Sequence, residues 1–121
     1  MEREKEEQNA HDSMLRTRAN NLKKEGYAVK ADLEEYEEKP EEINGKIPDI
    51  TATKDNEEII VEVETCESCT LEHTKEQYEA FSSVSGAEFH VVIPERCYEK
   101  AKAKAEEWGI KVDQWWTNKN Y

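Results

Sequence analysis

The stretch that decides the fold runs from Ile47 to Thr65 and reads Ile-Pro-Asp-Ile-Thr-Ala-Thr-Lys-Asp-Asn-Glu-Glu-Ile-Ile-Val-Glu-Val-Glu-Thr. Apolar and polar residues alternate on both sides of its middle, which is typical of two half-buried β-strands. Asp55 and Asn56 interrupt the alternation, and both residue types tolerate the positive φ angles of a type I′ turn. The stretch therefore predicts a β-hairpin whose turn is centred on these two residues.

The position of the turn also predicts which residues face each other across the hairpin. Counting outward pairs Asp49 with Glu62, about 5 Å apart at Cβ, and Glu64 follows on the same face. Such carboxylates repel one another unless they are solvated or share a cation, and their oxygens suit Mg²⁺. The sequence therefore predicts either a divalent-cation site, which suggests phosphodiester hydrolysis, or a wet acidic face that serves solubility.

The composition limits the partners that this chain can have. The 121 residues are enough for one domain, residues 1–121, with a single buried core. The net charge of -12 and the pI near 4.7 argue against a protein that grips nucleic acid through a broad basic surface. Any contact with DNA is therefore expected to be local and assisted by a metal or by a partner.

Cysteine count and hydropathy favour a cytoplasmic protein. The chain has three cysteines, which is an odd count, and its acidic start lacks the apolar core of a signal peptide. No apolar run is long enough to span a bilayer. We therefore expect a soluble, cytoplasmic protein with reduced thiols and no membrane partner.

Hydrophobic periodicity, together with glycines and prolines, predicts the other elements. They are a helix over residues 4–26, a strand over 27–33, an acidic loop over 34–42, a helix over 70–84, a strand over 87–93, a helix over 94–108 and a strand over 110–115. The order is helix, three strands, helix, strand, helix, strand. This order predicts an α/β fold, of the α+β type with a mixed sheet and helices against its faces.

The order of elements and the acidic residues resemble the PD-(D/E)xK nuclease superfamily, which includes restriction-endonuclease-like enzymes and archaeal Holliday-junction resolvases. Pro48-Asp49 on one strand and Glu62-Val63-Glu64 on the next carry this resemblance. It implies a restriction-endonuclease-like core and a metal-dependent deoxyribonuclease. It also implies that Asp49 and Glu62 ligate Mg²⁺ or Mn²⁺.

Two helices supply the other candidate site residues. The apolar stripe of the first helix extends backward by fours to His11 and Glu7, and the resemblance implies that one of them approaches the metal. On the helix over 70–84, His73 and Gln77 are one turn apart. Together with Lys75 they are candidates for the wall of a groove beside the carboxylates.

Glu64 departs from the pattern of the superfamily. Members usually carry a lysine at that position, which activates or orients the attacking water, although some type II restriction enzymes are similar in having glutamate there. Glu64 is therefore a third candidate catalytic residue. Lys46, Lys54 or Lys75 could instead supply the positive charge of the missing lysine. The missing lysine and the negative net charge favour an alternative function, a catalytically degenerate nuclease fold that acts as a binding or scaffolding subunit.

A rival metal site begins at Cys66. Cys66, Cys69 and His73 have a spacing that could bind Zn²⁺, with Cys97 or His90 as the fourth ligand. Ordinary buried thiols are the alternative, since the sequence lacks the second pair of ligands that structural zinc sites usually have.

Aromatic residues gather near the C-terminus, at Trp115, Trp116 and Tyr121. They could stack on bases, but no basic patch accompanies them. We expect them to cap the core or to contact a partner protein or a second copy of the chain, with Trp116 the best candidate for an interface.

Overall fold

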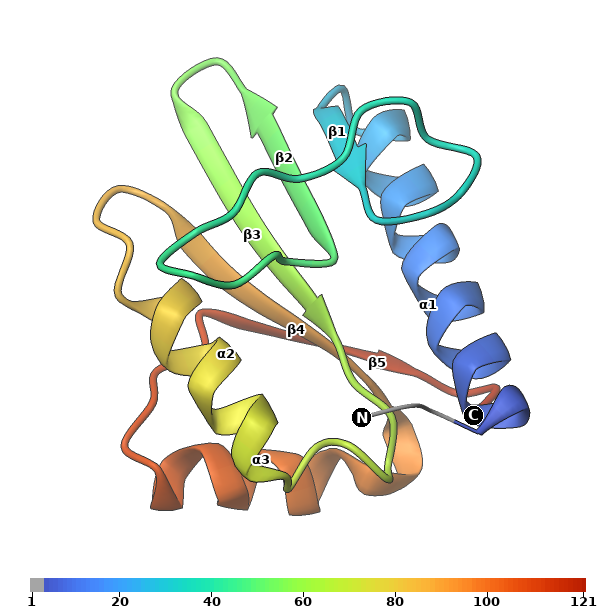
Figure 1. Cartoon of the computed structure of the whole chain (residues 1–121), viewed down its shortest axis with the longest axis vertical. Coiled ribbons are helices and arrows are strands. Elements are labelled where there is room, and N and C mark those ends of the chain that lie inside the picture. The colour runs from blue at the N-terminus through green and yellow to red at the C-terminus, as the bar shows by residue number, and fades with distance from the viewer. Residues whose placement is uncertain (1–3) are drawn as a thin grey trace.

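The computed structural model describes residues 4–121, and its elements follow the predicted order (Figure 1). They are α1 (Lys5–Lys24), β1 (Ala28–Ala31), β2 (Ile50–Lys54), β3 (Glu57–Val63), α2 (Glu72–Ser82), β4 (Glu88–Pro94), the 3₁₀ turn η1 (Glu95–Cys97), α3 (Tyr98–Glu107) and β5 (Gln114–Asn118). The strands form one sheet in the order β1-β2-β3-β4-β5, antiparallel from β1 to β3 and parallel from β3 to β5. The prediction of an α/β fold with a mixed sheet is confirmed.

The hairpin has the predicted register. Lys54 pairs with Glu57, so the turn is centred on Asp55 and Asn56. Asp55 has a positive φ of 54°, whereas Asn56 is not among the residues with positive φ. The predicted type I′ geometry, which needs positive φ at both central residues, is therefore wrong, although the pairing is right.

Alternation along the strands separates the two faces of the sheet. One face packs on α1 and the other on α2 and α3, which lie together in Figure 1. Consecutive right-handed crossovers that advance in one direction leave both helices on the same face, which explains this arrangement. The α1 core includes Leu15, Leu22, Ile50, Ile59, Val61 and Val63. The opposite core includes Ile60, Tyr78, Phe81, Phe89 and Val91.

The acidic run over residues 34–42 has no helix or strand, as predicted. Lys39 Nζ donates to the carbonyl oxygens of Leu33 and Tyr36 and thereby folds this run back on itself. Pro40 is buried, although most of the acidic side chains around it are exposed. Within residues 4–121, none of the helices combines the length and apolar character that spanning a membrane requires.

Candidate functional site

Asp49 and Glu62 lie side by side at the end of the hairpin away from its turn. The backbone N–H of Asp49 donates to Glu62 Oε1 at 3.1 Å, directly beyond the final pair of the β2–β3 ladder. Asp49 Oδ2 accepts a hydrogen bond from the backbone N–H of Val63 at 2.8 Å. The hairpin therefore makes Asp49 and Glu62 neighbours at this end of the sheet, as its register predicts.

The carboxylates are withdrawn from solvent. Glu62 and Glu64 are 2% and 1% exposed, and the Asp49 side chain is 13% exposed. Glu64 Oε1 accepts from Ser68 Oγ at 2.6 Å and lies 3.5 Å from Thr74 Oγ1. Burying a carboxylate removes its hydration, which hydrogen bonds or cations must replace. The alternative prediction of a wet acidic face is therefore wrong.

The first helix brings both of its candidate residues to this end of the sheet. His11 Nε2 lies 3.3 Å from Asp49 Oδ2, and Thr65 Oγ1 donates to Glu7 Oε2 at 2.8 Å. Thr65 directly follows Glu64, so Glu7 meets the end of β3. His11 and Glu7 are four residues apart, which places them on one face of α1.

Two hydroxyl groups after β3 belong to the site, although the sequence reasoning missed them. Ser68 Oγ accepts from the backbone N–H of Thr65 at 3.0 Å, and Thr65 Oγ1 accepts from the backbone N–H of Ser68 at 3.1 Å. This reciprocal turn aims Ser68 at Glu64 and Thr65 at Glu7. The signal was available, because Thr and Ser three residues apart after a strand are typical of such side-chain turns.

The face that α2 turns toward the core carries Thr74, Tyr78 and Phe81. His73 is exposed, while Lys75 and Gln77 are half-buried. Of these α2 side chains, Thr74 is therefore the one that contacts a carboxylate, that of Glu64. A groove role for His73, Lys75 and Gln77 stays a prediction.

The carboxylates of Asp49 and Glu62 suit a hard cation that also binds water or substrate. In the part of the chain that the structure describes, no three His, Cys, Asp or Glu side chains converge into a ready-made metal site. Asp49 and Glu62 offer carboxylate oxygens, and Mg²⁺ commonly takes one or two carboxylates with water and substrate oxygens as its remaining ligands. The two residues therefore suit Mg²⁺ or Mn²⁺, which keep water or substrate ligands, better than a metal whose ligands all come from the protein.

The cysteines differ from both predictions made for them. Cys66 and Cys97 form a disulfide with a Cα–Cα distance of 5.7 Å, and Cys69 is a buried free thiol. The expectation of reduced thiols is therefore wrong for Cys66 and Cys97. A thiolate is the zinc ligand, and a disulfide sulfur is not one, so the predicted Zn²⁺ set is not assembled. His73, its predicted histidine, is exposed.

The C-terminal aromatic residues are divided between the two sides of the sheet. Trp115 packs against the core under α2 and α3, and Tyr121 packs against the α1 core. Trp116 is 39% exposed, donates from Nε1 to His90 Nδ1 at 3.1 Å and has the Arg18 guanidinium over its ring at 4.0 Å. Two of the three therefore cap the core, and an interface at Trp116 stays a prediction.

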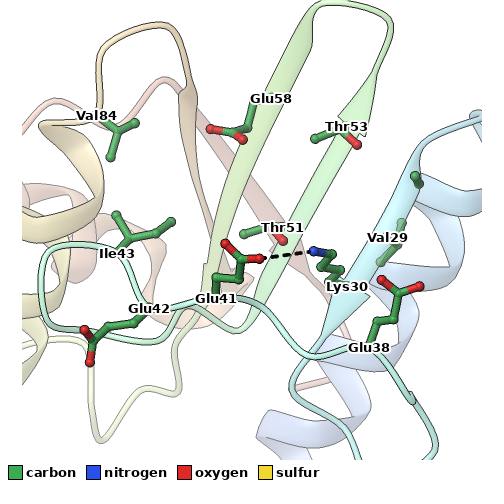
Figure 2. Close-up of a pocket in the computed structure, with 11 residues that line it drawn as sticks. Val29, Lys30, Glu38, Glu41, Glu42, Ile43, Thr51, Thr53, Glu58 and Val84 are labelled. Carbon is green, nitrogen blue, oxygen red and sulfur yellow. Dashed lines mark ion pairs between the residues drawn. The ribbon is translucent and has the colours of Figure 1, made fainter.

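A pocket of about 330 Å³ opens farther along the same sheet face, toward the hairpin turn (Figure 2). Thr51 belongs to its floor and alternates with Ile50 and Ala52 of the α1 core, so it faces away from α1, as Glu62 does. Lys30 Nζ in its wall lies 3.8 Å from Glu41 Oε1. Its acidic side chains are Glu38, Glu41, Glu42 and Glu58. A wall of this charge repels phosphate.

Comparisons with known proteins do not assign this chain to a family. No protein-family model, no curated protein and no solved structure matches it. Its function must therefore be inferred from the side chains at the end of the hairpin.

Proposed function

We propose that this protein is a small nuclease-like enzyme that binds Mg²⁺ or Mn²⁺ at Asp49 and Glu62 and hydrolyses DNA phosphodiester bonds. One observation carries the proposal: Asp49 and Glu62, whose carboxyl groups are withdrawn from solvent, are neighbours at the hairpin end, and His11 of α1 contacts Asp49. Burial of ionisable groups costs free energy, so folding alone does not favour them there. Clusters of this kind are typical of sites that perform chemistry.

Each residue of the site has a separate task in this proposal. Asp49 and Glu62 would hold the ion, since a backbone N–H fixes one oxygen of each carboxylate. A bound Mg²⁺ or Mn²⁺ would supply Lewis-acid stabilisation of negative charge on the phosphate. His11 orients Asp49, and Ser68 holds Glu64 beside the pair, where the resemblance to the nuclease superfamily places a lysine.

A second candidate function is a degenerate nuclease fold that serves as a binding or scaffolding subunit. Glu64 stands in the place of the lysine, and the pocket on the same sheet face has a negative wall. Both features oppose the approach of phosphate. In this case the partner is a protein, and the exposed Trp116 is the candidate contact.

Two assays in parallel separate these functions: calorimetric titration with Mn²⁺ and nicking of supercoiled plasmid DNA. For the nuclease we expect binding and nicking in the wild type, both lost in Asp49→Asn and in Glu62→Gln. Glu58→Gln is the matched control, because Glu58 is an exposed acid on the same strand. Binding without nicking would support the second function, and the absence of Mn²⁺ binding would contradict the nuclease proposal.

A further inference from the structure

The disulfide and the free thiol lie together at the turn that follows β3. Cys69 and Cys97 belong to one buried cluster, and Cys66 packs against that cluster. The Cys69 S–H donates to the carbonyl oxygen of Cys66, with the sulfur 3.6 Å from that oxygen. The three cysteines of the chain therefore meet at one place, where two of them are bonded and the third lies beside them.

The turn allows Cys66 to pair with Cys69 as well as with Cys97. The backbone N–H of Cys69 donates to the carbonyl oxygen of Thr65 at 3.1 Å, which closes one helix-like turn around Cys66. Residues three apart in such a turn are neighbours, with Cβ atoms about 5–6 Å apart, and a disulfide needs about 3.5–4.5 Å. A small movement of the turn therefore lets Cys69 replace Cys97 as the partner of Cys66.

A cavity of about 180 Å³ lies beside the disulfide, between the turn, η1 and α1. Its wall contains Thr65, Cys66 and Glu67 from one end of the disulfide and Pro94 and Arg96 from the other. Within residues 4–121, Cys66 is the cysteine that lines this cavity, and it is half-buried. The other two cysteines are 1% and 6% exposed. A molecule that enters the cavity therefore meets Cys66 before the other two.

The charge of the wall indicates which molecule fits. Glu6 and Glu7 of α1, together with Glu67, contribute carboxylates, whereas Arg96 contributes a guanidinium that donates to the carbonyl oxygen of Tyr121. The carboxylates outnumber the guanidinium, so the cavity attracts an ammonium group more strongly than a carboxylate. Its volume suits a compound of a few heavy atoms. A small aminothiol has the matching charge and size, and its sulfur can react with a disulfide.

We propose that Cys66, Cys69 and Cys97 form a thiol–disulfide exchange centre whose co-substrate is a small aminothiol. The thiolate of the aminothiol attacks Cys66 Sγ, the bond to Cys97 breaks, and the Cys97 sulfur leaves as a thiolate that takes up a proton. The thiolate of Cys69 then attacks Cys66 Sγ in the mixed disulfide, which forms a Cys66–Cys69 bond and releases the aminothiol. Each step breaks one disulfide and forms another, so no oxidant or reductant is consumed.

Lys100 of α3 is placed to assist the second step. Its Nζ donates at 3.0 Å to the carbonyl oxygen of Cys66, the same oxygen that the Cys69 S–H contacts. Burial raises the pKa of the Cys69 thiol, the positive charge of Lys100 opposes this effect, and Glu64 and Glu67 raise the pKa further. A cation beside a thiol favours the thiolate, which is the attacking species. Lys100 is therefore a positioning residue that should speed the attack by Cys69.

The test identifies the free cysteine before and after exchange. The oxidised full-length protein is incubated with an equimolar amount of cysteamine, labelled with N-ethylmaleimide under denaturing, mildly acidic conditions and digested with trypsin. Lys75 and Arg96 lie between Cys69 and Cys97, so trypsin places these two cysteines on different peptides. We expect the label to move from Cys69 to Cys97 in the wild type. In Cys69→Ser, any label on Cys97 should be accompanied by cysteamine bound to Cys66.

Rates test the roles of the cavity and of Lys100. Cysteamine should act about tenfold faster than mercaptopropionate, which carries a carboxylate, after each rate is divided by the rate of that thiol with a small disulfide. Lys100→Gln should slow the movement of the label, whereas Lys102→Gln, at an exposed position on the same helix, should not. A label that stays on Cys69, or that moves equally fast without a thiol, would overturn the proposal. Neither step uses Asp49 or Glu62, so failure of this proposal leaves the proposed function unaffected.

Discussion

His11 Nε2 lies 3.3 Å from Asp49 Oδ2, which links the first helix directly to the residue that precedes β2. His11 is 6% exposed, and its Nδ1 lies 3.1 Å from Asp12 Oδ1. Gln8 Nε2 donates to the same Asp12 oxygen at 2.8 Å. The histidine therefore stands between an aspartate of its own helix and an aspartate of the proposed metal site.

Replacing this histidine tests the link. His11→Phe keeps a ring in the core but removes both nitrogen contacts, and we expect a loss of about 1–2 kcal/mol in the free energy of unfolding. Mn²⁺ binding should also weaken, because Asp49 loses the group that orients it. Urea denaturation and calorimetry measure the two effects. Gln8→Ala, which removes only the outer contact to Asp12, is the control and should change stability by no more than about 0.5 kcal/mol.

Ser68→Ala tests whether the turn after β3 holds the buried carboxylate. The variant removes the hydroxyl that donates to Glu64 Oε1 and accepts from the Thr65 N–H. Removing a hydrogen-bond donor from a buried carboxylate lowers the free energy of unfolding by about 1–3 kcal/mol. Chemical denaturation can detect a change of this size. Ser85→Ala, at an exposed serine after α2, serves as the control. Equal stability of the two variants would show that the Ser68 hydroxyl is not needed.

The disulfide should contribute strongly to stability. Cys66 and Cys97 are separated by 31 residues, and closing a loop of that length stabilises a fold by about 3–4 kcal/mol in the chain-entropy description. We therefore expect a dithiol reductant to lower the melting temperature of the wild type but not that of a Cys66→Ser, Cys97→Ser double variant. Alkylation of the unfolded protein should add one label before reduction and three after it. Three labels without reductant would contradict the disulfide.

The hairpin and the order of elements could be predicted from the sequence, because they depend on local signals. Alternation defines strand faces, and the turn residues Asp55 and Asn56 define the register that places Asp49 beside Glu62. The turn type could not be predicted as reliably, since both residue types tolerate either sign of φ.

What the sequence could not show depends on which element covers which face. Alternation places Glu62 and Glu64 on one face of β3 but does not show that the folded protein buries them, so the sequence predicts a solvated cluster equally well. The pairing of Cys66 with Cys97 depends on the approach of η1 to the segment after β3, which are remote in sequence.

His90 should make stability depend on pH. It is 3% exposed, its Nε2 lies 2.9 Å from Glu88 Oε1, and its Nδ1 accepts the indole N–H of Trp116. Burial lowers the pKa of His90, Glu88 opposes this effect, and the Arg18 guanidinium lowers the pKa further. Asp113 also opposes the lowering. A histidine with a depressed pKa stabilises the fold above its unfolded pKa of about 6.5 and loses that contribution as the pH falls through its folded pKa.

Protonation of His90 would also place a proton on Nδ1, which could then no longer accept the hydrogen bond from the indole N–H of Trp116. We therefore expect the stability advantage of the wild type over His90→Gln to narrow as the pH falls from about 7 to about 5, since the amide cannot titrate. Urea denaturation at each pH measures this difference. His73→Gln, at an exposed position on α2, should follow the wild type throughout. An advantage over His90→Gln that stays constant with pH would mean that His90 does not titrate in this range and that its contribution to stability comes from packing.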